Sequence, residues 1–142
     1  MPPDKLELEI VTPDRLVLRD EADEVQVPGK NGYLGILPGH APLITELKVG
    51  ELSYRKDKAT HRISVAGGYS EILPDRVTLL AETAEKPEEI DVKRALASKA
   101  RAEKRLADPQ NPDTDFDRAA VSLQRALIRL QVSGKRTADH SG

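Results

Sequence analysis

The chain of 142 residues contains no cysteine, which excludes disulfide bonds and thiolate metal sites. Its three histidines, His40, His61 and His140, are spread along the sequence, and this spacing argues against a zinc site. Tryptophan is absent, and there are only one phenylalanine and three tyrosines. The core must therefore be built from valine, leucine, isoleucine and alanine.

Long apolar runs are also missing, since none approaches the roughly 20 residues that span a bilayer. The first ten residues, MPPDKLELEI, lack the basic and apolar regions of a signal peptide. We therefore expect a soluble protein that reaches a membrane only through a partner. The net charge of −2 gives no field for nucleic acid, so we expect no nucleic-acid partner.

Known catalytic patterns are absent as well. The sequence has no Ser-His-Asp signature, no glycine-rich phosphate loop and no histidine cluster with metal-ligand spacing. We therefore expect a protein that is not an enzyme. A nucleotide hydrolase is the weakest alternative, because it would need a base and metal ligands that the sequence does not offer.

Glycine and proline divide the chain into two parts. Residues 1–84 hold seven of the ten prolines and seven of the nine glycines, whereas no glycine occurs from Tyr69 to Ser133. Nine of the fifteen alanines follow Ala84. This contrast predicts an all-β domain over residues 1–84 and a two-helix hairpin over residues 85–142.

The first part has the alternation of β-strands with one buried face. Leu6, Leu8 and Ile10 alternate with Glu7 and Glu9, and similar short runs recur between turns. We expect Gly67-Gly68 to break one strand from the next and to form a bulge. About ten short strands at this spacing predict a β-sandwich or flattened barrel.

The second part predicts two helices joined by a turn at Asp108–Asp113, which contains Pro109 and Pro112. Asp91 is suited to cap the first helix, and Gly134 to end the second. The expected apolar seams are thin and leave a marginal, mobile arm, followed by a loose terminus after Gly134. The seam residues are Val92, Ala95, Leu96, Ala100 and Leu106 on the first helix, and Phe116, Ala120, Leu123, Leu127 and Leu130 on the second.

Four arginines stand at helical spacing in this hairpin. Arg94 and Arg101 are seven residues apart, and Arg125 and Arg129 are four apart, so each pair shares one helix face. In an antiparallel hairpin the four guanidinium groups can converge, and such groups suit phosphate oxygens. The alternative is a solvated helix face with local ion pairs to Asp or Glu.

The stretch Gly32–Ile44, GYLGILPGHAPLI, combines three glycines and two prolines with apolar side chains, which excludes a helix. Together with the early strand LELEIVTP, the run Ala66-Gly67-Gly68 and the alanine-rich helical tail, it closely resembles the epsilon subunit of F-type ATP synthases. The resemblance extends from about Leu6 to Val132. It agrees with the predicted sandwich and hairpin.

The resemblance implies a non-catalytic subunit of the rotor stalk that couples the gamma subunit to the membrane c-ring. It implies a place on the cytoplasmic face of the bacterial inner membrane, reached only through the complex. The implied contacts with the c-ring are Tyr33, Pro38, His40 and Pro42. Tyr33 departs from the acidic residue of many members, and by itself His40 is typical of an ordinary turn residue.

The resemblance also extends to members whose hairpin binds ATP. Ile90-Asp91-Val92-Lys93-Arg94-Ala95 and Arg125-Ala126-Leu127-Ile128-Arg129 match their two motifs without departure. No cofactor is required, and ATP is implied as a regulatory ligand that holds the hairpin in a compact, non-inhibitory form. The implied ATP-binding residues are Glu85, Ile90, Asp91, Arg94, Arg101, Arg125 and Arg129.

In the extended form the family's hairpin reaches an acidic segment of the beta subunit and blocks ATP hydrolysis. The residues implied for that contact are Lys99, Lys104, Arg105 and Arg118, together with Arg101, Arg125 and Arg129 of the ATP set. The alternative from another functional class is a β-sandwich adaptor that dimerises through the Phe116–Leu130 seam. A stable homodimer would distinguish it.

Overall fold

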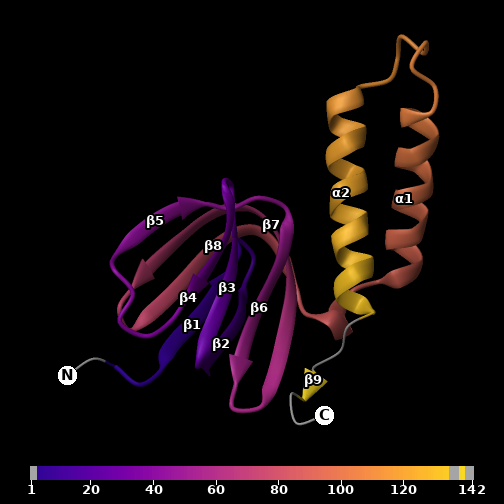
Figure 1. The fold of residues 1–142 in the computed structure, drawn as a ribbon. Helices are drawn as coiled ribbons and strands as arrows, with labels where there is room; N and C mark the ends of the chain where they lie inside the picture. Colours follow the sequence, from indigo (N-terminus) through magenta and orange to yellow (C-terminus); the bar gives the residue numbers. More distant parts are fainter. Residues whose placement is uncertain (1–2, 135–137, 140–142) are drawn as a thin grey trace.

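The computed structural model of the chain describes residues 3–134 and 138–139. A β domain is followed by two antiparallel helices that stand at one end of it (Figure 1), as the sequence predicts. The strands are β1 (Leu6–Val11), β2 (Leu16–Ala22), β3 (Glu24–Gly29), β4 (Gly32–Ile36), β5 (Leu43–Glu46), β6 (Gly50–Lys56), β7 (Ala59–Leu73) and β8 (Arg76–Glu85). The helices are the short 3-10 helix η1 (Pro87–Glu89), α1 (Val92–Leu106) and α2 (Phe116–Ser133).

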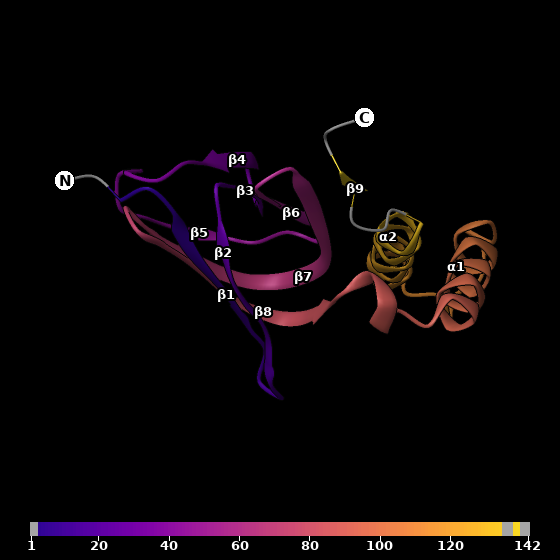
Figure 2. The same ribbon diagram turned by 90° about the horizontal axis from the view of Figure 1, so that it is seen from below.

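One curved sheet makes both layers of the β domain. Its strands follow the order β2-β1-β8-β7-β6-β3-β4, and β5 pairs with β7 outside this path. The sheet curves round so that β3, β4 and β6 lie opposite β1 and β8 (Figure 2). A two-residue strand, β9 (Ala138–Asp139), pairs with the start of β7, while the rest of the predicted loose terminus lies outside the described residues.

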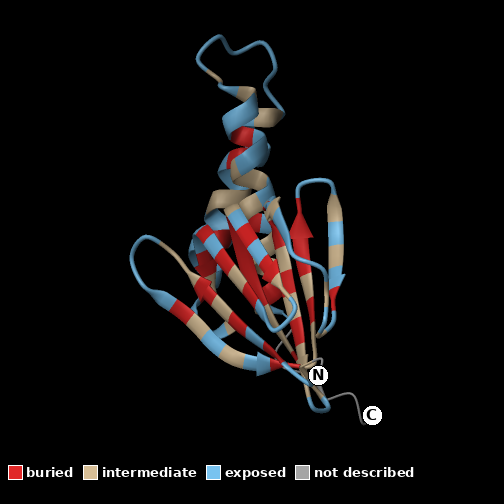
Figure 3. Cartoon of the chain, turned by 90° about the vertical axis from the view of Figure 1, so that its left-hand side faces the viewer, coloured by how far each residue is buried: buried red, intermediate tan, exposed pale blue. Residues whose placement is uncertain are grey.

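Aliphatic side chains fill the space between the layers. Leu6, Leu8 and Ile10 are fully buried, so the alternation in β1 correctly predicted which face is covered. Buried residues concentrate in the strands, whereas the free end of the hairpin is exposed (Figure 3). The other large core residues are Val25, Val27, Ile36, Leu52, Tyr54, Ile63, Val65, Ile72, Val77 and Leu79.

The prediction that Gly67-Gly68 separates two strands is wrong. Strand β7 is continuous over 15 residues, and its register with β8 is unchanged on either side of the glycines, so no bulge residue is inserted. Both glycines have positive φ. They bend β7 where it exchanges one partner for another, since its first half pairs with β6 and its second half with β5.

Gly68 also permits the backbones of β7 and β8 to approach closely. A Cβ atom at this position would lie 2.0 Å from the carbonyl oxygen of Leu80 in β8. No side chain can be accommodated there unless β7 and β8 separate. The hydrogen bonding of β8, the strand that leads to the hairpin, therefore depends on a glycine.

Asp20 in β2 and Asp23 in the turn that follows are tied to the hairpin of β6 and β7. Asp20 accepts hydrogen bonds from the Tyr54 hydroxyl at 2.9 Å and from Lys56 Nζ at 2.6 Å. Asp23 pairs with Lys5 and accepts from the Asp57 amide at 2.8 Å. These carboxylates therefore join three separate segments at the edge of the core.

The hydrogen bonds lower the pKa of both aspartates. For Asp20, burial acts to raise the pKa, but the bonds from Lys56 and Tyr54 outweigh it. For Asp23, the bond from Lys5 is the main cause of the lowered pKa, followed by the Asp57 amide. Both groups stabilise the fold in their ionised form.

The helices begin where local chemistry predicts. Asp91 caps α1 by accepting from the Arg94 amide at 3.0 Å, which confirms the predicted cap. Asp115 caps α2 in the same way through the Arg118 amide at 3.0 Å. Gly134 follows the last residue of α2, as expected.

The predicted helical seam is partly wrong. Ala95 and Ala102 of α1 and Ala119 and Ala126 of α2 are buried, whereas the predicted seam residues Val92, Leu96, Ala100, Ala120 and Leu127 are exposed. Alanines at a seven-residue spacing let two helix backbones approach closely and leave larger side chains at the margins. In addition, α2 lies between α1 and the sandwich (Figure 2). It therefore packs on two sides, whereas the prediction assumed one apolar stripe facing α1.

Replacing Gly68 by alanine should lower the free energy of unfolding by at least about 2 kcal/mol, through backbone strain and the clash with Leu80. Gly39→Ala is the matched control, because Gly39 also has positive φ but a Cβ atom added there would have nothing within 4 Å. Its cost should be limited to about 1 kcal/mol of conformational strain. Urea denaturation measures both values, and equal losses would contradict the close-approach explanation.

The fold should lose stability in acid as Asp20 and Asp23 become protonated. Their folded pKa values lie below the ordinary value, so their contribution is complete above about pH 4 and disappears as pH falls through the folded values. An Asp20→Asn, Asp23→Asn variant should be less stable at neutral pH but lose less between pH 5 and pH 3. Thermal melts across this range test it, with exposed Asp75→Asn as control. A wild-type-like acid loss in the double variant would refute the assignment.

Candidate functional site

One face of α2 meets the sandwich at the end of β8. Arg125, Arg129 and Val132 are spaced four and three residues apart and therefore share this face. Arg129 Nε donates to Glu85 Oε1 at 2.6 Å, and Arg125 Nη2 lies 3.7 Å from Glu82 Oε2. Val132 is fully buried. The interface thus combines one apolar contact with two arginine–carboxylate pairs.

A further polar contact extends this interface towards β6. Gln131 Nε2 donates to Glu51 Oε1 at 3.3 Å, and Glu51 also lies 3.6 Å from Arg62 Nε. Carboxylates from β6 and β8 therefore face the last two turns of α2. The surface of the sandwich here is acidic, and the helix face that covers it is basic.

Arg125 has an unused hydrogen-bond donor. Its Nε atom is buried and has no hydrogen-bond partner among the described residues. A buried donor without an acceptor costs free energy, and guanidinium groups bind phosphate or carboxylate oxygens through two donors at once. The α2 side of the interface therefore presents a donor that an anionic group can bind.

The remaining predicted ATP-binding residues lie at the linker and on α1. Ile90 is buried in the linker, and the carboxylate of Asp91 is engaged with the Arg94 amide. Arg94 and Arg101 are exposed on α1, where Arg101 donates to Ser98 Oγ at 3.1 Å. The structure pairs Glu85 with Arg129 and places Arg125 on the same face of α2. Among the described contacts, none joins Arg94 or Arg101 to them.

Sequence reasoning missed Glu82 and Glu51 as partners of the basic helix. Glu82 stands three residues before Glu85, and this acidic pair ahead of the basic helices was a usable indication. No feature of the sequence indicated Glu51, because its position beside α2 depends on the pairing of β6 with β7 and on the docking of the hairpin.

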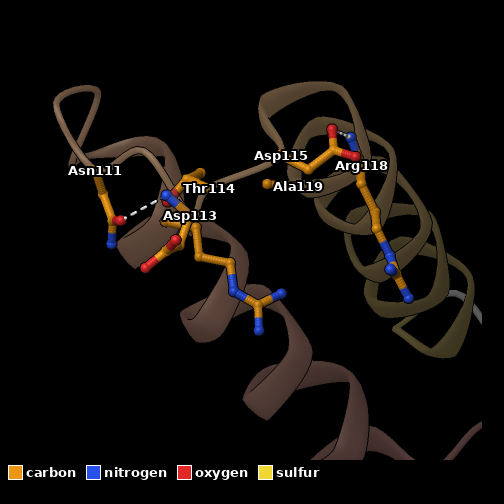
Figure 4. A pocket seen from close by; sticks show the side chains of 7 residues that line it. Asn111, Asp113, Thr114, Asp115, Arg118 and Ala119 are labelled. Carbon is orange, nitrogen blue, oxygen red and sulfur yellow. Dashed lines mark hydrogen bonds between the residues drawn. The ribbon is translucent and has the colours of Figure 1, made fainter.

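Basic side chains gather at the free end of the hairpin. Arg105 and Arg118 line a hollow of about 470 Å³ there, together with Asn111, Asp113 and Thr114. Figure 4 shows the Asn111 side chain bonded to the Asp113 amide and Asp115 turned back on the Arg118 amide. Lys104 lines an adjoining hollow with Arg101, and Lys99 is half-buried on α1. Arg105 near the end of α1 and Arg118 near the start of α2 lie at the end of the hairpin that points away from the sandwich (Figure 1), whereas Lys99 lies near the middle of α1.

The Gly32–Ile44 stretch forms β4, a turn and the start of β5. Tyr33 is half exposed, and its hydroxyl accepts from the Glu51 amide at 3.2 Å. The turn that holds Pro38, His40 and Pro42 is fixed at Gly39, whose amide donates to Pro74 O at 2.7 Å. Tyr33 therefore touches the start of β6, whereas His40 lies beside the turn that precedes β8.

An exposed apolar patch crosses the outer face of the sheet. Ile44, Tyr69 and Leu80 are 69%, 57% and 59% exposed, and strand pairing places all three on the same face of β5, β7 and β8. Leu16 extends the patch through β1 to β2, with 48% exposure. Large apolar side chains that are grouped on one surface are typical of a protein interface.

Neither a metal site nor a membrane span emerges from the described part of the chain. No group of three or more His, Cys, Asp or Glu side chains there could hold a metal ion. In the same residues no helix is long and apolar enough to cross a membrane. The candidate functional surfaces are therefore the α2 interface, the basic residues of the hairpin, the Gly32–Ile44 stretch and the apolar patch.

Comparison with known proteins accounts for nearly all of the chain. The family model "ATP synthase, Delta/Epsilon chain, beta-sandwich domain" matches residues 5–87, and "ATP synthase, Delta/Epsilon chain, long alpha-helix domain" matches residues 88–134. An ATP synthase epsilon chain of Geobacter sp. is 49% identical over 134 residues, which cover 94% of this chain and 97% of that protein. The epsilon chain of Koribacter versatilis is 63% identical over 103 residues, 72% of each protein.

The fold is similar to that of a chain in the cryo-EM structure of Euglena gracilis mitochondrial ATP synthase, which contains OSCP, F1 and the c-ring. The TM-score is 0.79 at 17% identity, and the match covers 95% of this chain and 84% of that one. The two family models together span both structural parts described above. The chain belongs to the ATP synthase delta/epsilon chain family.

Proposed function

We propose that this chain acts as the epsilon subunit in the rotor stalk of a bacterial F-type ATP synthase, with no catalytic activity of its own. Its sandwich joins the gamma subunit to the c-ring, and its hairpin regulates ATP hydrolysis. The stalk role is supported by the match to epsilon chains over almost the full length of both proteins. In this role the protein lies at the cytoplasmic face of the membrane, held there only through the complex.

The apolar patch of Leu16, Ile44, Tyr69 and Leu80 is the proposed docking surface for gamma. Burial of these side chains would contribute about 25 cal/mol for each Å² of apolar surface removed from water. The Gly32–Ile44 stretch, with Tyr33, Pro38, His40 and Pro42, is the proposed contact with the c-ring. Fixation of its turn to Pro74 supports this role, because a loop that carries torque needs a rigid support.

The hairpin is the proposed regulatory element, and the paired arginines of α2 are the observation that carries this proposal. Its contacts with the sandwich include two ion pairs at the surface, where a single pair contributes about 0.2–1 kcal/mol. Such an interface can open without unfolding of the sandwich. Once released, the hairpin would meet the acidic segment of the beta subunit through Lys99, Lys104, Arg105 and Arg118.

ATP is the proposed ligand of the docked form. Arg125 offers an unused buried donor, and Arg129 holds a single carboxylate that a phosphate could replace. Glu85, Ile90 and Asp91 would lie towards the base and ribose, while Arg94 and Arg101 would turn towards the phosphates. A ligand that binds only the docked form stabilises it by RT ln(1 + [L]/Kd). High ATP therefore keeps the hairpin docked, and low ATP releases it.

Isothermal titration of the full chain should give saturable ATP binding without phosphate release. Arg125→Ala and Arg129→Ala should each weaken binding about tenfold or more, because each removes a charged donor from the phosphates. Arg118→Ala, on the same helix but at the free end, is the matched control and should bind normally. Unchanged affinity in the Arg125 variant would refute the pocket, and released phosphate would instead support a hydrolase.

The docking surface can be tested separately with purified gamma subunit. Leu80→Glu places a charge in the centre of the patch and should weaken gamma binding about tenfold or more. Leu96→Glu is the control, since Leu96 is similarly exposed on α1 but lies outside the patch. Surface plasmon resonance measures both affinities. Equal affinities of the two variants would place the gamma contact elsewhere.

A further inference from the structure

One carboxylate fixes the linker between β8 and α1 to the sandwich. Glu89 Oε1 accepts from the Lys86 amide at 2.9 Å, which closes the turn of η1. Its other oxygen, Oε2, pairs with Arg15 Nη1 at 2.9 Å. Arg15 lies in the turn between β1 and β2, which is closed by a bond from the Thr12 amide to Arg15 O at 3.0 Å. Glu89 thus shapes the linker and anchors it through the same side chain.

The linker is also packed against the hairpin. The 3-10 helix η1 contacts both β7 and α2, and Ile90, the next residue, is only 8% exposed. Pro87 and Glu88 border a small hollow of about 70 Å³ with Tyr54 and His61. Because the end of α2 rests on η1, undocking of the hairpin removes one side of the packing that keeps the linker in place.

We propose that the Arg15–Glu89 pair is a latch that stabilises the docked hairpin independently of nucleotide. This inference rests on the hairpin switch proposed above. It acts through the linker, whereas the Arg125 and Arg129 pairs act through α2. The latch and the α2 pairs are therefore separate restraints on one movement. A nucleotide that binds the α2 arginines replaces neither partner of the latch.

The electrostatics of Glu89 agree with this role. Burial acts to raise its pKa, but the hydrogen bonds from Arg15 and from the Lys86 amide outweigh burial and lower it. The carboxylate is therefore charged at neutral pH. Its side chain is 31% exposed and that of Arg15 is 44% exposed, so the pair is partly screened and can open.

The absence of native cysteine provides a direct assay of undocking. A Val132→Cys substitution introduces one thiol at a fully buried position, on the face of α2 that meets the sandwich. Reaction of this thiol with a maleimide in the full chain, without nucleotide, reports how often the hairpin leaves the sandwich. In this background, Glu89→Gln and Arg15→Gln should each speed the reaction about two- to fivefold.

The controls separate the ion pair from other effects. Glutamine at position 89 keeps an oxygen that can accept from the Lys86 amide, so only the charge is lost. Glu88→Gln changes the neighbouring carboxylate and should label at the parental rate, as should Arg15→Lys, which keeps the pair. Circular dichroism verifies that each variant is folded. The Arg15→Gln, Glu89→Gln double variant should label no faster than either single variant, because both remove one shared interaction.

Labelling of both single variants at the Glu88→Gln rate would overturn the latch, and so would additive effects in the double variant. Addition of ATP to the Val132→Cys protein tests the proposed nucleotide switch on its own. Faster labelling of the Glu89→Gln variant with no effect of ATP would support the latch and refute nucleotide sensing. Slower labelling with ATP but no effect of Glu89→Gln would support nucleotide sensing and refute the latch.

Discussion

The backbone contact between β7 and β8 at Gly68 is the constraint on which the arrangement of the two parts depends. β8 is paired with β7 from Arg76 to Glu85, and its first half, Arg76 to Leu80, is also paired in parallel with β1. The strand carries Glu82 and Glu85 to the edge of the sandwich and continues directly into the linker. A displacement of β8 would move the carboxylates that receive α2 and the start of the hairpin together.

The two parts are held by different kinds of interaction, and this difference suits a rigid stalk with a movable arm. Inside the sandwich, aliphatic side chains are fully buried, and each contributes about 1.5–3 kcal/mol. Between the sandwich and the hairpin, the contacts include two ion pairs whose side chains are 28% to 65% exposed, the Gln131–Glu51 hydrogen bond and the buried side chain of Val132. The second set is the weaker of the two, which fits the proposed role of a hairpin that moves while the sandwich stays folded.

The sequence predicted features that depend on local periodicity or chemistry, such as the covered face of β1, the cap at Asp91 and the end of α2. It misplaced features that depend on two neighbours at once. Gly67-Gly68 was predicted to break a strand because glycine weakens strands, but β7 pairs with β8 on both sides of the glycines and therefore continues through the bend. Leu127 looked like a seam residue because leucine dominates most seams, but α2 faces both α1 and the sandwich, and alanines form the closer contact. The shared helix face of the arginines could be predicted from their spacing, whereas the contacts of Glu82 and Glu51 with α2 depend on the tertiary structure.

The pairing of Arg125 and Arg129 with carboxylates has a consequence for the proposed regulation. An arginine cluster without partners would repel itself and open the hairpin whenever nucleotide left. Here Glu82 and Glu85 supply negative charge to the same guanidinium groups, and Glu89 holds the linker through Arg15. The docked form therefore has its own stability without a nucleotide. In the proposed regulation, ATP would exchange carboxylate contacts for phosphate contacts, and its net effect on docking would be the difference in free energy between these two sets. The charge of Glu82 and Glu85 would then set the ATP concentration at which the hairpin is released.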